Sequence, residues 1–215
     1  MKKLVIAFAT AALAFAPAFS QEEAAKEKKK MPSTAKYFTS LASAKKEAEK
    51  YDAPIFVAAV GKGSPAEALV KKFINHKYFR ELATKGFFVY TMKVELSKKE
   101  KDMDGRSPKP LYEKLSADDQ ALLDVICPPD KVRKLPVFGM VTPDAKQVKI
   151  KVVDMPRPPS PTSDYYGAYL QNLQSAAQAY GIDIDMSKDM RKYIENPPPE
   201  KKSKKGDKKN DKKKK

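Results

Sequence analysis

The chain carries two kinds of hydrophobic pattern, one with helical spacing and one made of short unbroken runs. Helical spacing covers residues 38–51, where the apolar positions are Phe38, Leu41, Ala42, Ala48 and Tyr51. The apolar run at 55–60 is continuous and bounded by Pro54 and Gly61, which predicts a strand buried on both faces. Helical spacing then returns at Ala66, Leu69, Val70, Phe73 and Ile74. The sequence therefore predicts a helix–strand–helix unit.

The start of the second helix is marked by three residues. Ser64 is a favourable N-cap, Pro65 fits the first helical position, and Glu67 completes a capping box. The sequence therefore predicts a tight loop that leads directly from the buried strand into a helix.

The remaining patterns predict further elements in a fixed order. They are a short helix ending at Gly86, a strand over 87–95, a charged loop over 97–110, one or two helices over 111–126, a β-hairpin of strands 137–141 and 147–153, a helix from Ser163 to Tyr180, and a short helix from Ser187. Alternating α and β elements followed by an antiparallel pair predict an α/β fold, with a mixed sheet of about four strands flanked by helices.

The two ends of the chain have a different composition from the middle. Residues 1–20 combine Lys2 and Lys3, an apolar run and a small-residue cleavage site, which predicts a secretory signal peptide. We therefore expect an exported protein, periplasmic or secreted in a bacterium, with retention of the signal as an anchor as the alternative. The predicted divisions are a polar linker over 21–36, a domain over 37–182, a short helical coda over 183–195, and a disordered Pro/Lys-rich tail over 196–215.

Much of the positive charge lies in the tail. The whole chain has a formal net charge of +16, and ten lysines against three acidic residues give residues 196–215 a charge of +7. A lysine segment without arginine or aromatic residues can bind polyanions without sequence preference. An anionic envelope polymer or lipid is therefore a possible partner and specific nucleic acid is not, while a merely solubilising tail is the alternative.

Few residues offer chemistry. Cys127 is the only cysteine, so no intrachain disulfide can form, and it is either an inert, partly buried side chain or a single reactive thiol. His76 is the only histidine, which leaves no convincing catalytic triad or His-based metal site. The acidic run from Asp183 to Asp189 lacks the glycine and glutamate of a calcium loop and predicts a capped turn instead. We expect no cofactor and no metal.

Several motifs occur in the order typical of a known superfamily. Leu135-Pro136 precedes the strand 137–141 and the turn Pro143-Asp144-Ala145-Lys146, and residues 69–83 form the helical segment after the loop. This order resembles the thioredoxin-like superfamily, of the exported bacterial type in which a helix precedes the first strand. The resemblance covers residues 38–180 and implies a three-layer sandwich. It also implies a cis Pro136 opposite the loop, with an ordinary trans proline as the alternative.

The resemblance breaks at the residues that would carry redox chemistry. It places the family's Cys-x-x-Cys on Gly63, Ser64, Pro65 and Ala66, with Lys62 where an aromatic residue is usual. Thiol–disulfide exchange needs an attacking thiolate and a second, resolving thiol, and the loop has neither.

Two hypotheses remain for the degenerate loop. It is either kept only for structure, or it binds a peptide or anion together with a lip formed by Leu135 and Pro136. We therefore expect a redox-inactive binding module of the cell envelope. A relative with single-cysteine chemistry at Cys127, or a polyanion-binding protein acting through its tail, is the alternative.

Overall fold

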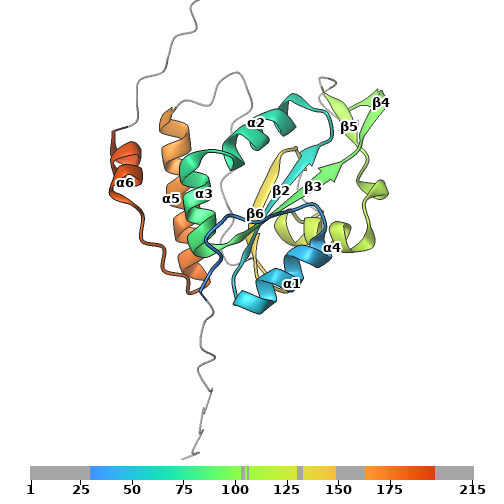
Figure 1. Cartoon of the computed structure of the whole chain (residues 1–215). Coiled ribbons are helices and arrows are strands. Elements are labelled where there is room, and N and C mark those ends of the chain that lie inside the picture. The colour runs from blue at the N-terminus through green and yellow to red at the C-terminus, as the bar shows by residue number, and fades with distance from the viewer. Residues whose placement is uncertain (1–29, 103–104, 106, 130–132, 149–162, 197–215) are drawn as a thin grey trace, which may run out of the picture.

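The structure is a computed structural model that describes residues 30–102, 105, 107–129, 133–148 and 163–196. The predicted signal peptide, most of the predicted linker, residues 149–153 of the predicted hairpin and the predicted tail beyond Asn196 lie outside the described residues. The described chain is a mixed α/β fold built on a four-stranded sheet with helices on both faces (Figure 1).

The sheet has the strand order β1-β3-β2-β6. Its strands are β1 (Tyr37–Phe38), β2 (Ile55–Gly61), β3 (Phe88–Val94) and β6 (Val137–Val141). The first three run parallel to one another, and β6 is antiparallel to β2. An antiparallel bridge between Val141 and Val148 continues the sheet beyond β6. The expectation of a mixed sheet is confirmed.

Strand β2 is the centre of the molecule because every one of its seven residues is buried. Its side chains alternate between two hydrophobic cores, as the period of a strand requires. Phe56, Ala58 and Val60 belong to one core, and Ile55, Val57 and Ala59 belong to the other. The prediction of a strand buried on both faces is confirmed.

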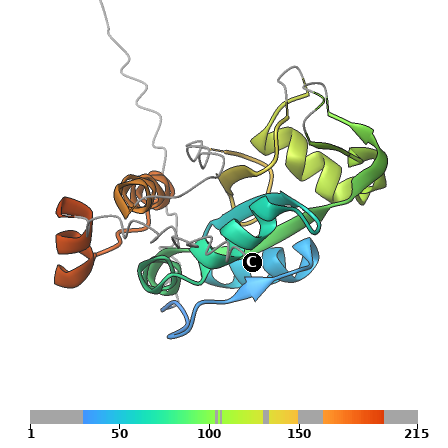
Figure 2. The same ribbon diagram turned by 90° about the horizontal axis from the view of Figure 1, so that it is seen from above.

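Different helices cover the two faces. Helices α2 (Pro65–Ile74), α3 (Lys77–Gly86) and α5 (Ser163–Ala179) contribute to the first core, with α6 (Lys188–Glu195) packed beside them. Helices α1 (Leu41–Tyr51) and α4 (Ala117–Ile126) contribute to the second core, and the short 3-10 helix η1 (Tyr112–Lys114) precedes α4. Seen from above, α5 and α6 lie on the opposite side of the molecule from α4 (Figure 2).

Two of the predicted elements were wrong in detail. Phe38 is not in the first helix, because Tyr37 and Phe38 pair with Val89 and Tyr90 as the edge strand β1. The predicted charged loop over 97–110 contains a two-stranded antiparallel ribbon of β4 (Leu96–Lys101) and β5 (Pro108–Pro110). The ribbon projects beyond the main sheet, so its lysines and glutamates stay in solvent and give no hydrophobic strand pattern.

The segment 182–196, which we call the C-terminal strap, packs against the helical layer instead of trailing from it. It follows α5, is hydrogen-bonded to Glu81 and Lys85 of α3, and ends in α6, which packs against α5. Ile184 and Met190 are buried in the first core, with exposed fractions of 1% and 0%. The helix predicted from Ser187 is therefore present, and it is part of the packed body.

Candidate functional site

The predicted loop lies at the carboxyl end of β2. After Gly61, the Lys62 N–H donates to the Val94 carbonyl at 2.8 Å, and the Ser64 N–H donates back to the Gly61 carbonyl at 3.0 Å. Gly63 adopts a left-handed conformation with φ of 75°, which L side chains rarely adopt. These contacts turn the chain sharply from the strand into α2, as the sequence predicted.

The helix start is closed by its own side chains. The Ser64 hydroxyl accepts the Glu67 N–H at 3.2 Å, which confirms the predicted N-cap. The Glu67 carboxylate accepts the N–H of Gly63 at 2.6 Å, not that of Ser64. The reciprocal half of the predicted capping box is therefore shifted by one residue, because the Ser64 N–H is already used by Gly61.

The charges of the loop are also paired. Lys93 on β3 approaches Glu67 at 3.0 Å, and Lys62 approaches Glu95 at 3.6 Å, with Lys114 on the other Glu95 oxygen at 3.4 Å. The Gly63 N–H first, and then Lys93, hold the pKa of Glu67 below its usual range. A carboxylate of this chain therefore already occupies the position at the helix N-terminus that would attract an external anion.

The predicted lip lies at the same end of the sheet. Val137, the first residue of β6, pairs with Ala59 of β2, so Leu135 and Pro136 reach the end of β2 from which the loop departs. The Leu135–Pro136 peptide bond is cis, the isomer that the resemblance implies. Both residues are half-buried, and the Leu135 side chain packs against the second core. The fold thus brings the loop and the lip to one edge.

The main chain of Leu135 lacks internal partners within the described part of the protein. Neither its N–H nor its carbonyl bonds to another described residue, although β6 begins two residues later. Ala66 and Leu69 on the first turns of α2 are likewise only half-buried. Such a combination of unpaired backbone and partly exposed apolar side chains suits contact with an extended chain. No pattern in the sequence predicted the unpaired backbone.

Cys127 does not belong to this site. It follows α4 in the second core, on the face of the sheet opposite α2, and its exposed fraction is 5%. Its carbonyl accepts Arg133 Nε at 2.8 Å, which orders the turn around it. A thiol in this position lacks the access to solvent that a nucleophilic cysteine needs.

The other candidate residues serve the structure. Among the described residues, no group of three or more His, Cys, Asp or Glu side chains is arranged to hold a metal ion. The acidic run near residue 185 forms a capped turn: the Ser187 hydroxyl accepts the Met190 N–H at 3.2 Å, and Asp185 pairs with Arg191. The expectation of a capped turn is confirmed. His76 stands at the N-cap of α3 without a side-chain cap bond to that helix.

Two comparisons with known proteins found no match. No model of a protein family matches the chain, and no curated protein is significantly similar to it. Within the described residues, no helix combines the length and the hydrophobicity that crossing a membrane requires.

Proposed function

We propose that this chain is an exported, redox-inactive member of the thioredoxin-like superfamily that acts as a binding module in the bacterial cell envelope. In this proposal the ligand is an extended peptide segment of another protein, which binds beside Leu135 and Pro136. Export rests on the signal-like residues 1–20.

Three features support the thioredoxin-like fold. A helix precedes the first buried strand, the parallel strands β2 and β3 are followed by the antiparallel β6, and the Leu135–Pro136 bond at the start of β6 is cis. Each feature matches what the resemblance implies.

The contacts of the loop support redox inactivity. Ser64 holds the N-cap position, where a thiol would be activated by the helix, and its hydroxyl is engaged with the Glu67 N–H. The only thiol of the chain lies across the sheet and is buried. Single-cysteine chemistry at Cys127 is therefore the weaker alternative.

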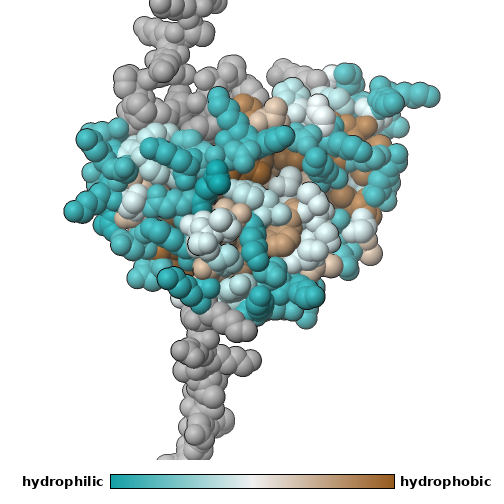
Figure 3. All heavy atoms as spheres, viewed as in Figure 1, coloured by the Kyte–Doolittle hydropathy of each residue, from teal (hydrophilic) through white to brown (hydrophobic). Residues whose placement is uncertain are grey.

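The observation that carries the binding proposal is the unpaired main chain of Leu135 among the described residues. An extended peptide can pair with one donor and one acceptor there, while its side chains contact the half-buried Leu135, Ala66 and Leu69. A small anion is a poorer ligand for this edge, because it must displace the Glu67 carboxylate from Gly63 and Lys93. The face in Figure 3 is mostly hydrophilic, with smaller hydrophobic areas below α2 and near β4 and β5.

A binding assay with matched variants tests the proposal. The probe is the tightest-binding member of a library of unstructured, fluorescein-labelled decapeptides, followed by fluorescence anisotropy with the exported protein. Leu135→Asp should weaken binding at least tenfold. Lys62→Glu should change binding little, because Lys62 is exposed and already paired with Glu95.

Leu115→Asp is the matched control for lost packing. Leu115 is half-buried against the same core as Leu135, but it follows η1. Equal binding by the wild type and Leu135→Asp, or equal losses in Leu135→Asp and Leu115→Asp, would contradict the proposed position of the site.

A second candidate function belongs to the tail. Its ten lysines favour attachment to an anionic envelope polymer or lipid by counterion release. Removing residues 197–215 should abolish salt-sensitive binding to phosphatidylglycerol vesicles and leave decapeptide binding unchanged. Vesicle binding that survives the truncation would rule out this role.

A further inference from the structure

The C-terminal strap (residues 182–196) is held to the helical layer at three places. At its beginning, Ile184 is buried, and the Ile184 carbonyl accepts Gln174 Nε2 of α5 at 3.0 Å. Gly86 at the end of α3 makes room for it, since a Cβ at Gly86 would lie 2.3 Å from Ile184 Cδ1. This part of the strap is fixed by close packing.

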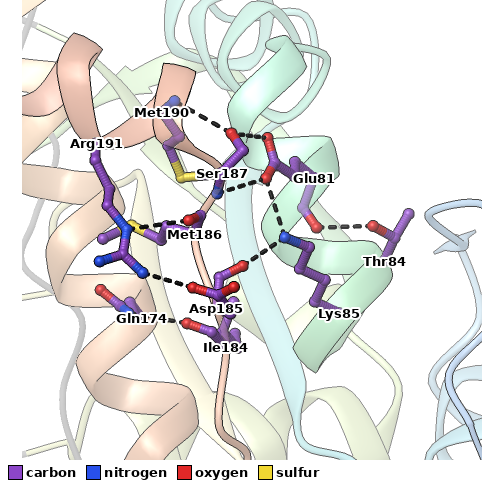
Figure 4. A network of polar contacts seen from close by, with 10 residues as sticks. All are labelled: Glu81, Thr84, Lys85, Gln174, Ile184, Asp185, Met186, Ser187, Met190 and Arg191. Atoms are coloured by element: carbon purple, nitrogen blue, oxygen red, sulfur yellow. Dashed lines mark hydrogen bonds and ion pairs between the residues drawn. The ribbon is translucent and has the colours of Figure 1, made fainter.

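In its middle, the strap is held by a polar network centred on Glu81 of α3 (Figure 4). The Glu81 carboxylate accepts the Ser187 N–H at 3.1 Å and the Ser187 hydroxyl at 3.0 Å. Lys85 donates to the same carboxylate at 3.1 Å and also to the Asp185 carbonyl. The N-cap residue of α6 is therefore bound by a glutamate of another helix.

At its end, the strap is held by aromatic contacts with the start of α3. The rings of His76, Tyr78 and Tyr193 lie against one another, with centroid distances of 5.5 Å for His76–Tyr78, 5.5 Å for His76–Tyr193 and 4.9 Å for Tyr78–Tyr193. The Tyr78 hydroxyl also donates to the Asp189 carbonyl at 3.1 Å. We call these three rings the His–Tyr cluster. It joins the N-cap of α3 to the last turns of α6.

We propose that the His–Tyr cluster makes the docking of α6 sensitive to pH: α6 is docked on α3 and α5 while His76 is neutral, and protonation of His76 favours its release. Release would detach α6 and its C-cap residue Asn196 from the domain.

The charges of α3 disfavour a cation at His76 whether α6 is docked or released, and the ring of Tyr193 adds burial only in the docked state, which sets the direction of the effect. His76 is half-buried at the N-terminus of α3, where the helix dipole disfavours a cation, and its neighbours on that helix include Lys77 and Arg80. Glu81, one turn further, is engaged by Ser187 and Lys85.

From α6, Asp189 and Lys192 line a shallow hollow of about 210 Å³ beside the two tyrosines. Their opposite charges offset each other, and the faces of the tyrosine rings give only a modest attraction for a cation. Burial first, and then Lys77, hold the pKa of His76 below its usual value of 6.5, in agreement with the geometry.

The direction in which pH changes the docking of α6 follows from this lowered pKa of His76. Well above pH 6.5, His76 is neutral whether α6 is docked or released, so the docked state keeps its full stability. As the pH falls from 6.5 toward the lower pKa of the docked state, the released state binds the proton more tightly and its population rises. Between the two pKa values, each unit by which the pH falls should raise the released fraction about tenfold.

Hydrogen exchange of the full exported chain, followed by NMR at pH 7.5 and pH 5.5, tests the proposal. After correction for the intrinsic exchange rates, the protection of α6 amides should fall several-fold at pH 5.5, while the protection of β2 amides stays constant. His76→Phe keeps an aromatic ring against Tyr78 and Tyr193 but cannot titrate, so the pH-dependent loss should disappear.

Glu81→Gln is the control for docking without a change in titration at residue 76. It should lower the protection of α6 amides at both pH values, and the ratio of the protection at pH 7.5 to that at pH 5.5 should equal the wild-type ratio. The same several-fold loss in His76→Phe would overturn the proposal. If that variant fails to fold, His76→Gln takes its place: a pH-independent protection of α6 supports the proposal, and the same several-fold loss as in the wild type overturns it.

Discussion

The starts of α2 and α6 use the same two residue types to close a helix N-terminus, but they draw them from different places. In α2, Ser64 accepts the Glu67 N–H, and the Glu67 carboxylate accepts the N–H of Gly63. In α6, Ser187 accepts the Met190 N–H, and a glutamate again accepts the N–H just before the helix. That glutamate is Glu81, 106 residues earlier in the chain.

The difference separates a helix that caps itself from a helix that is docked. The hydrogen bonds of Ser64 and Glu67 stabilise the first turn of α2 and fix the loop, and only the partly exposed ion pair of Glu67 with Lys93 reaches another element. The bond between Glu81 and Ser187 exists only while α6 lies on α3, so its free energy contributes to docking. The comparison therefore predicts that substitutions in the loop change amide protection only locally. Substitutions in the strap should lower the free energy of unfolding of the whole domain.

The largest effect is expected at the buried side chain of the strap. Met190→Ala should lower the free energy of unfolding by about 2–5 kcal/mol, because it leaves a cavity where Met190 is fully buried. Urea unfolding followed by circular dichroism measures the loss. Met186→Ala, a half-buried change in the same strap, is the control and should cost clearly less. Equal costs would show that the strap is not part of the core.

A smaller effect is expected where α3 meets the strap. Gly86→Ala should lower the free energy of unfolding by about 1–2 kcal/mol, because the new Cβ overlaps Ile184. In the Ile184→Val background the same change should cost less, since Val lacks the Cδ1 atom nearest to the new methyl group. Identical costs in both backgrounds would refute the close contact.

The two glutamates should differ in the range of their effects. Glu81→Gln should cost about 1–2 kcal/mol and reduce amide protection throughout α6, because it weakens the bonds to Ser187. Glu67→Gln should cost about 0.5–1 kcal/mol, with loss of protection confined to the first turn of α2. Hydrogen exchange measures both patterns, and a loss that spreads beyond α2 in Glu67→Gln would break the comparison.

The smallest effect is expected for the exposed ion pair of the loop. Lys62→Ala should leave the urea midpoint almost unchanged, and any difference from the wild type should vanish in 0.5 M salt, because both Lys62 and Glu95 are largely exposed. A clear shift of the midpoint that persists at high salt would mean that Lys62 holds the loop in place.

The same contrast explains what could be predicted from the sequence. The buried strand, the cap at Ser64 and the helix after it depend on neighbouring residues, so their pattern is visible in a short window. The predicted helix from Ser187 was found for the same reason. The loop and Leu135–Pro136 were brought to one edge by the order of the elements, which the sequence also carries.

What the sequence could not provide are contacts between distant residues. No pattern links Glu81 to Ser187, or His76 to Tyr193, because each pair is joined only by the packing of α6 on α3. The ribbon of β4 and β5 was missed because its exposed side chains lack the alternation of a half-buried strand. The unpaired backbone of Leu135 follows from strand register, which residue types alone do not determine.

The central claim is that an extended peptide binds at the edge formed by the loop and Leu135. Amide NMR spectra of the protein, recorded while the selected decapeptide is added, test this claim most directly. We predict that the amide signals of Leu135 and of residues 62–64 shift with saturation, while those of α6 do not. Saturable binding that leaves the Leu135 amide unchanged and shifts the signals of α3 and α6 instead would contradict the claim.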